Sequence, residues 1–171
     1  LPNLKKISFD FEGCDHPALA GAAVAIAQSK SVEDLSIINY PASEDLRELI
    51  QSLKILPKLR TLRLEPMRGT LWSNLQVLRI AQLLKNNLSL EDFTLDFFQK
   101  VEDNVSAMPL MTALRTNNKL HTLSLDGGAS SNSELEALVA PFQALVDILG
   151  SHNYALEEVK LRNLSFLQSF D

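Results

Sequence analysis

The sequence predicts an α/β fold made of about six repeated units, each a short strand followed by a helix. A six-residue apolar pattern recurs along the whole chain, and the stretches between its copies have helical periodicity. Polar residues alternate with apolar ones in the strands, so only one face of the sheet is expected to be covered. We therefore expect a solenoid, or horseshoe, with a curved parallel sheet on the concave face and helices on the convex face, formed by residues 1–171 as a single domain.

The repeated motif is apolar-x-x-apolar-x-apolar, and its successive copies begin 28, 27, 31, 30 and 36 residues apart. The copies lie at residues 4–9, 32–37, 59–64, 90–95, 120–125 and 156–161. Six strand–helix units could also form a doubly wound sheet, but its strands would be apolar almost throughout because helices cover both faces. The alternation of polar residues here favours the open solenoid.

Amphipathic stretches between the copies predict the helices. In residues 43–56 the leucines and isoleucine recur three and four positions apart, which gathers them on one helix face. The predicted helices span residues 18–29, 43–56, 75–84, 105–114 and 133–149. Pro141 is expected to break or kink the last of them.

Asparagines follow three of these helices, at Asn86 and Asn87, at Asn117 and Asn118, and at Asn153. Asparagine tolerates the left-handed backbone conformation in which many helices end. The sequence therefore predicts asparagine C-caps before three of the strands.

Composition disfavours several other classes of protein. The chain is 46% hydrophobic and 22% charged, which is typical of a globular domain. A net charge of −5 disfavours nucleic acid and anionic membranes as partners, and no apolar run reaches the roughly 18–20 residues of a membrane span. The single cysteine, Cys14, fits a reducing compartment, so we expect a cytoplasmic protein. The chain opens on Leu at the first strand, and we expect it to be part of a longer protein.

The copy at residues 120–125, with the segment 113–118 before it, resembles the ribonuclease-inhibitor-like class of leucine-rich repeats. The resemblance covers essentially the whole chain and implies a period near 28 residues with helices on the convex side. Irregular repeats of this kind occur in intracellular immune receptors, F-box adaptors, actin pointed-end cappers and injected bacterial effectors. The resemblance is therefore specific for fold and says little about function.

The chain departs from this family at one position of the motif. The family places Asn or Cys eight positions after the first Leu, where the side chain bonds neighbouring loops. Here those positions hold Glu12, Tyr40, Met67, Phe98, Gly128 and Leu164. The strand-to-helix turns must therefore be held in another way, and no asparagine ladder is expected in them.

The polar strand positions predict the binding surface. The third, fifth and seventh positions of each copy should face the concave side, and the seventh is acidic in four copies. An acidic edge would suit a basic helix or loop of a partner protein, although an acidic protein also has acidic solvated strands without any partner. The predicted partner-binding residues are Asp10, Asp34, Arg63, Glu65, Asp92, Asp96, Asp126 and Trp72.

Trp72 enters this set because Pro66 and Gly69 make its loop resemble a projecting one, and tryptophan is common in interface hot spots. The alternative is that Trp72 packs in the loop core, as expected for Tyr40 and for the Phe97–Phe98 pair.

No catalytic constellation is found in the sequence. His16, His121 and His152 fall in different repeats and have no spacing typical of zinc ligands. Ser124 and Asp126 lie near His121, but neighbouring strand residues alternate faces, and a triad is not expected. We expect no enzyme, cofactor, metal or small-molecule substrate.

The sequence thus predicts a protein–protein interaction module, the recognition domain of a larger intracellular protein, which binds its partner on the concave strands. One alternative is a cytoskeletal regulator like the actin pointed-end cappers, which would bind through its convex helices and C-terminal tail. Another is an accessory repeat domain of a bacterial effector or ubiquitin-ligase adaptor.

Overall fold

The computed structural model describes residues 3–13, 16–40, 47–67, 72–96, 108–126, 147 and 155–162. Six strands form one sheet in the order β1-β2-β3-β4-β5-β6, and every neighbouring pair is parallel. The elements are β1 (Lys6–Asp10), α1 (His16–Ala27), β2 (Asp34–Tyr40), α2 (Arg47–Lys54), β3 (Thr61–Pro66), α3 (Asn74–Asn86), β4 (Asp92–Asp96), α4 (Met108–Thr116), β5 (Thr122–Asp126) and β6 (Glu158–Arg162).

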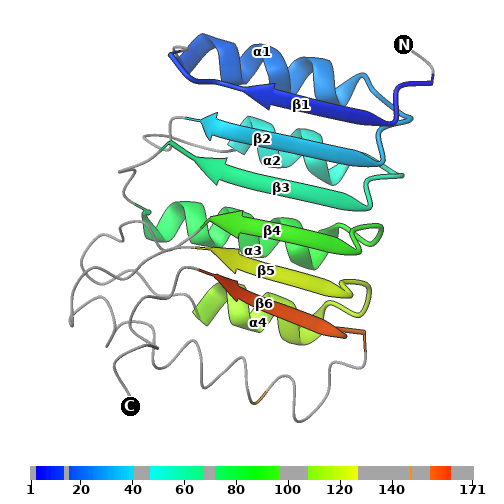
Figure 1. Cartoon of the computed structure of the whole chain (residues 1–171), viewed down its shortest axis with the longest axis vertical. Coiled ribbons are helices and arrows are strands. Elements are labelled where there is room, and N and C mark those ends of the chain that lie inside the picture. Colours follow the sequence, from blue (N-terminus) through cyan, green and yellow to red (C-terminus); the bar gives the residue numbers. More distant parts are fainter. Residues whose placement is uncertain are drawn as a thin grey trace.

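The four helices of the described part lie together behind the sheet (Figure 1). Strands and helices thus form two layers, as the alternation of polar strand residues predicts, and the α/β fold with a six-stranded parallel sheet is confirmed. The predicted helix at residues 133–149 lies outside the described residues, apart from Asp147.

Equivalent motif positions pair across the sheet, so each position forms a row that crosses all the strands. The fourth position runs through Leu35, Leu62, Phe93 and Leu123, none of which is more than 1% exposed. These side chains meet the buried face of the helices, for example Leu49 and Leu53 of α2. The core is therefore a continuous slab between sheet and helices.

Main-chain bonds fix the start of each strand against the preceding one. The carbonyl of Glu33 accepts hydrogen bonds from the N–H groups of both Arg60 and Thr61, at 2.8 and 2.9 Å. The same pair of bonds recurs at the carbonyls of Lys5, Arg60, Glu91 and His121. Each second-position carbonyl thus holds the second and third positions of the next repeat.

Helix α3 begins with a capping box. The N–H of Gln76 donates to Ser73 Oγ, and the N–H of Ser73 donates to Gln76 Oε1 at 2.8 Å. This arrangement satisfies two main-chain donors that the first helical turn leaves without helical partners.

Asparagines connect adjacent repeats, but in a different way from the C-caps predicted above. Asn87 has an extended backbone, with φ −85° and ψ 112°, so the left-handed conformation expected for it is wrong. Its side chain accepts from the N–H groups of Ser89 and Leu90 and donates to the carbonyl of Leu53 in the preceding repeat at 3.2 Å. An asparagine link therefore exists before the strands, three positions ahead of the first motif leucine.

Asn117 repeats this arrangement one unit later. It accepts from the N–H groups of Lys119 and Leu120 and donates to the carbonyl of Leu84 at 2.6 Å. Asn153 holds the same sequence position before β6 but lies outside the described residues.

Candidate partner-binding face

The face of the sheet turned away from the four described helices (Figure 1) is here called the open face. The alternating burial in β1, β3 and β4 places the third, fifth and seventh motif positions on it. On β1 the side chains at these positions are exposed, and on β2 and β4 they are half-buried. The strand registers place Asp34 beside Thr61 and Asp92 beside Thr122. The structure thus brings the predicted strand residues onto one surface.

Ion pairs neutralise part of the acidic surface. Lys6 Nζ lies 2.7 Å from Asp34 Oδ2, and Arg63 donates to Glu65 within the same strand. At the far side of the sheet Lys160 pairs with Glu158 at 2.7 Å. All of these groups are partly solvated, and such pairs contribute little to stability. Their main effect is to reduce the net charge that a partner would meet on β1, β2, β3 and β6.

Asp10 is held by its neighbours rather than by a cation. Its Oδ1 accepts from Asn39 Nδ2 at 2.9 Å and from the N–H of Glu12 at 3.0 Å. The hydrogen bond from Asn39 lowers the pKa of Asp10 most, and the bond from the N–H of Glu12 lowers it further. Asn39 can reach it because β2 has a bulge there, and Asn39 adopts a left-handed backbone with φ 54°.

Two carboxylates lie near the centre of the open face, on β4. Asp92 is half-buried, and no described residue forms an ion pair with it. Asp96 is also half-buried and has one oxygen out of contact with solvent. Asp96 pairs in register with Asp126 of β5, whose side chain lies outside the described part. Strand β4 therefore contributes two carboxylates to the central part of this face.

Asp96 lies close enough to Tyr40 to affect its ionisation. Tyr40 is fully buried at the end of β2, and burial raises the pKa of its hydroxyl. The negative charge of Asp96 raises it further. The prediction that Tyr40 packs in the core is confirmed. Its buried hydroxyl lies close enough to Asp96, a seventh-position residue, for the two groups to interact.

The predicted role of Trp72 is wrong in this structure. Trp72 is 0% exposed and belongs to the central core cluster, so it cannot contact a partner directly. Ser124 is likewise buried, at 5% exposure, so the fifth-position row is not exposed along its whole length.

A second row of charges was missed in the sequence, although its signal is visible there. The second motif positions alternate in sign for four repeats, before the strands begin; the row is Lys5, Glu33, Arg60, Glu91, His121 and Glu157. The structure gives Lys5 and Glu33 a salt bridge of 3.1 Å, and Arg60 Nε donates to Glu91 Oε2 at 2.9 Å. We call this the second-position row.

Arg60 and Glu91 form the strongest pair of the row. Their hydrogen bond raises the pKa of Arg60 and lowers that of Glu91, and the charges of Glu33, His121 and other neighbours act in the same directions. A cavity of about 460 Å³ follows the row, lined by Glu33, Arg60 and His121 among others. This edge offers a partner charges of both signs.

No group of three or more metal-ligating side chains occurs in the part of the chain that the structure describes. His121 is exposed at the N-terminal edge of the sheet, whereas Ser124 is buried within β5. Among the described helices none is long and apolar enough to cross a membrane.

Neither a protein-family model nor a curated protein sequence matches this chain. Among solved structures, the chain is similar to a tropomodulin C-terminal domain from Caenorhabditis elegans, with a TM-score of 0.58 and 18% sequence identity. The alignment covers 87% of this chain and 86% of that one. At this identity the likeness shows the fold alone, which is an α/β fold like that of leucine-rich repeats.

Proposed function

We propose that the chain is a protein-interaction module that binds a partner protein across the open face. The observation that carries the proposal is that all the described helices cover one face of the sheet, while polar, half-exposed side chains occupy the other. A broad array of this kind can meet a folded partner without any rearrangement of the core.

The proposal includes the ribonuclease-inhibitor-like class and a concave open face. Parallel strands lie about 4.8 Å apart, whereas packed helices need roughly 8–10 Å. A sheet with one helix behind each strand therefore bends with its strands on the inside. Concavity would bring the side chains of successive strands toward a shared partner.

Charge points to a partner with a basic surface. Asp92 lies on β4, near the centre of the sheet, and among the described residues the cations Lys6, Arg63 and Lys160 of this face pair with other carboxylates. Complementary charge increases the rate of association and the specificity of an interface. Asp92 is the anchor to test, because its carboxylate forms no ion pair with a described residue, although its charge also acts on Arg60.

The test is a pull-down with the immobilised chain and three variants. Asp92→Lys, and Asp92→Lys with Thr94→Lys, change the centre of the open face, while Glu48→Lys makes the same charge change on helix α2. Partners should be retained by the wild type and by Glu48→Lys and lost from the other two. Equal retention by all four proteins would contradict the proposed face.

A non-enzymatic role and a cytoplasmic location remain part of this proposal. Some charged groups of the open face pair with one another, as Lys6 does with Asp34 and Arg63 with Glu65. A screen for hydrolase and transferase activity with the purified chain would test the first statement, and fractionation of cells that express the protein would test the second.

A second candidate is a cytoskeletal regulator like the actin pointed-end cappers. It is favoured by the likeness to a tropomodulin domain over nearly the full length of both chains. Co-sedimentation with actin filaments tests it directly. Binding that persists in Asp92→Lys but is lost when helix residues are changed would favour this candidate over the first.

A further inference from the structure

Three turns that lead from a helix into the next strand form one edge of the molecule, here called the turn edge. The strands that follow them, β3, β4 and β5, are parallel, so their starting ends lie side by side. Each turn places two inner residues between two buried ones; these pairs are Pro57 with Lys58, Leu88 with Ser89, and Asn118 with Lys119. Ser89 is half-buried and the other inner residues are exposed, Leu88 at 71%. An exposed leucine therefore lies between two exposed lysines along this edge.

Buried asparagines hold the main chain of two of these turns. Asn117 Oδ1 accepts from the N–H of Lys119 at 2.9 Å, and Asn87 Oδ1 accepts from the N–H of Ser89 at 3.0 Å. The backbone that carries Leu88 and Lys119 is therefore fixed by the fold. A surface that is already ordered loses less conformational entropy when a ligand binds.

The cavity of about 460 Å³ described above borders the turn edge. It is lined by all three inner pairs and by four members of the second-position row, from Glu33 to His121. No third-, fifth- or seventh-position residue of the open face lines it. The turn edge is therefore a concave surface separate from the open face.

The carboxylates of the cavity already have cationic partners. Glu33 forms its salt bridge with Lys5, and Glu91 accepts from Arg60. Lys58, in contrast, forms no ion pair in the part of the chain that the structure describes.

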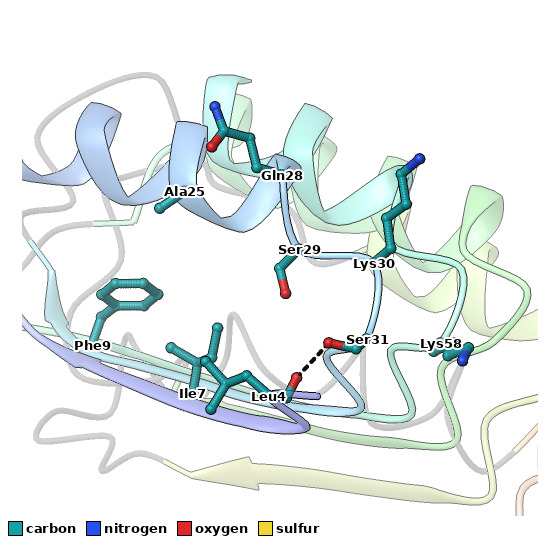
Figure 2. A pocket seen from close by; sticks show the side chains of 9 residues that line it. All are labelled: Leu4, Ile7, Phe9, Ala25, Gln28, Ser29, Lys30, Ser31 and Lys58. Atoms are coloured by element: carbon teal, nitrogen blue, oxygen red, sulfur yellow. Dashed lines mark hydrogen bonds between the residues drawn. The ribbon is translucent and has the colours of Figure 1, made fainter. Parts of the chain in front are cut away.

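Lys119 forms no ion pair with a described residue either, although its charge also acts on Glu91. Lys30 extends the positive charge by one repeat, since it precedes β2 at the position that Pro57 holds before β3. Figure 2 shows Lys30 and Lys58 on the turns of neighbouring repeats. The lysines of this edge are thus available to an added negative group.

The spacing of the lysines fits an extended peptide. Lys58 and Lys119 hold the position before the first motif leucine in repeats two apart, and neighbouring parallel strands are about 4.8 Å apart. Their main chains are therefore separated by about 10 Å, which an extended segment covers in roughly three residues. Leu88 lies in the repeat between them, so a segment that reaches both lysines passes over this leucine.

We propose that the turn edge binds a short acidic segment of a partner protein, in which carboxylates flank an apolar side chain. The carboxylates would reach Lys58 and Lys119, and the apolar side chain would cover Leu88 and Pro57. A nucleic acid or an anionic membrane fits less well, because Glu33 and other carboxylates of the second-position row interrupt the positive surface. This site is independent of the proposed binding at the open face.

Titration of the chain with the peptide Asp-Glu-Leu-Leu-Glu-Asp, followed by the main-chain amide signals in NMR, tests the proposal. The wild type should bind with a Kd below about 1 mM, and the signals of the three turns should shift most. Binding should weaken as sodium chloride is added, because salt screens exposed charges. Lys58→Glu and Lys119→Glu should each raise the Kd at least about tenfold, since each replaces an attraction by a repulsion.

The matched control is Arg47→Glu, which makes the same charge change at the first residue of helix α2, at the other end of that helix from the Lys58 turn. It should bind as the wild type does, and far-UV circular dichroism shows whether each variant is folded. Leu88→Ser tests the apolar contact and should raise the Kd about tenfold. The peptide with serines in place of its leucines should bind the wild type about tenfold more weakly, but should lose little further affinity for Leu88→Ser.

Three results would overturn the proposal. The wild type could fail to bind the peptide, or Lys58→Glu and Lys119→Glu could bind it as well as Arg47→Glu does. Single-stranded oligothymidine or phosphatidylserine vesicles could also bind more tightly than the peptide and lose affinity in Lys58→Glu, which would assign the edge to phosphate groups instead. None of these results bears on binding at Asp92, so failure of this proposal is distinguishable from failure of the proposed function.

Discussion

The side-chain amide of Asn117 donates to the main-chain carbonyl of Leu84, 33 residues earlier, at 2.6 Å. The same side chain accepts from two N–H groups of its own turn, so it connects a helix end, a turn and the next strand. Asn117 is buried at 6% exposure, which leaves no water to replace these bonds if they are lost.

Asn117→Ala should therefore destabilise the fold. The carbonyl of Leu84, the buried N–H of Leu120 and the partly buried N–H of Lys119 would lose their partner, and the expected cost is about 1–3 kcal/mol of unfolding free energy. Urea unfolding followed by circular dichroism measures it. The neighbouring Asn118→Ala, at an exposed position, is the control and should change stability by less than about 0.5 kcal/mol.

The capping box of α3 gives a second prediction. Ser73→Ala removes the acceptor for the N–H of Gln76, and the expected loss is about 1 kcal/mol. Ser73→Asp keeps a side-chain oxygen at the cap and should restore most of this stability. Equal unfolding midpoints for the alanine variant and the wild type would contradict the structural role of the cap.

Trp72 is the single tryptophan of the chain, so its environment can be measured directly. Because it is fully buried, its fluorescence should be blue-shifted in the native state and protected from quenching by acrylamide. Both properties should be lost in denaturant. Strong quenching in the native state would instead support a projecting loop. Trp72→Ala should cost about 3–5 kcal/mol, as expected for a large buried aromatic side chain.

The Arg60–Glu91 pair predicts a dependence of stability on acid. The pKa of Glu91 is lowered from its ordinary value of 4.5, chiefly by the hydrogen bond from Arg60. The folded state therefore binds fewer protons than the unfolded state, so the contribution is present above pH 4.5 and is lost as the pH falls through the lowered pKa.

Unfolding free energies measured at a series of acidic pH values check this dependence. Glu91→Gln should give a shallower loss of stability in acid than the wild type, and Arg60→Gln should have a similar effect. The double variant should add nothing beyond either single change if the two residues act as one pair. An unchanged slope in all three variants would show that the hydrogen bond does not persist in solution.

The strands could be predicted from the sequence because their signal is periodic. Each observed strand begins at the third position of its motif, from Lys6 in β1 to Glu158 in β6. The buried first, fourth and sixth positions follow from the same alternation. Helix limits were less well predicted: the helix expected over residues 43–56 ends at Lys54 in α2 (Arg47–Lys54), and residues 43–46 lie outside the described part.

For the candidate surface, the sequence predicts which motif positions face the open side, but not which single side chains are exposed there. The third, fifth and seventh positions follow from the strand period, but that period does not give the exposure of each side chain. Ser124 is buried at a fifth position, and Trp72 lies between β3 and α3, where the strand period does not apply. The second-position row was missed because it precedes the strands, where alternation of apolar residues gives no indication of side-chain direction.

The paired bonds to each second-position carbonyl have a consequence for how such a chain can vary. These bonds join main-chain atoms only, so the geometry of each junction does not depend on which side chain occupies the second position. Lysine, glutamate, arginine and histidine all occur there in the same backbone arrangement. Substitutions in the second-position row can therefore change the surface charge of the molecule while the main-chain bonds between its repeats stay the same.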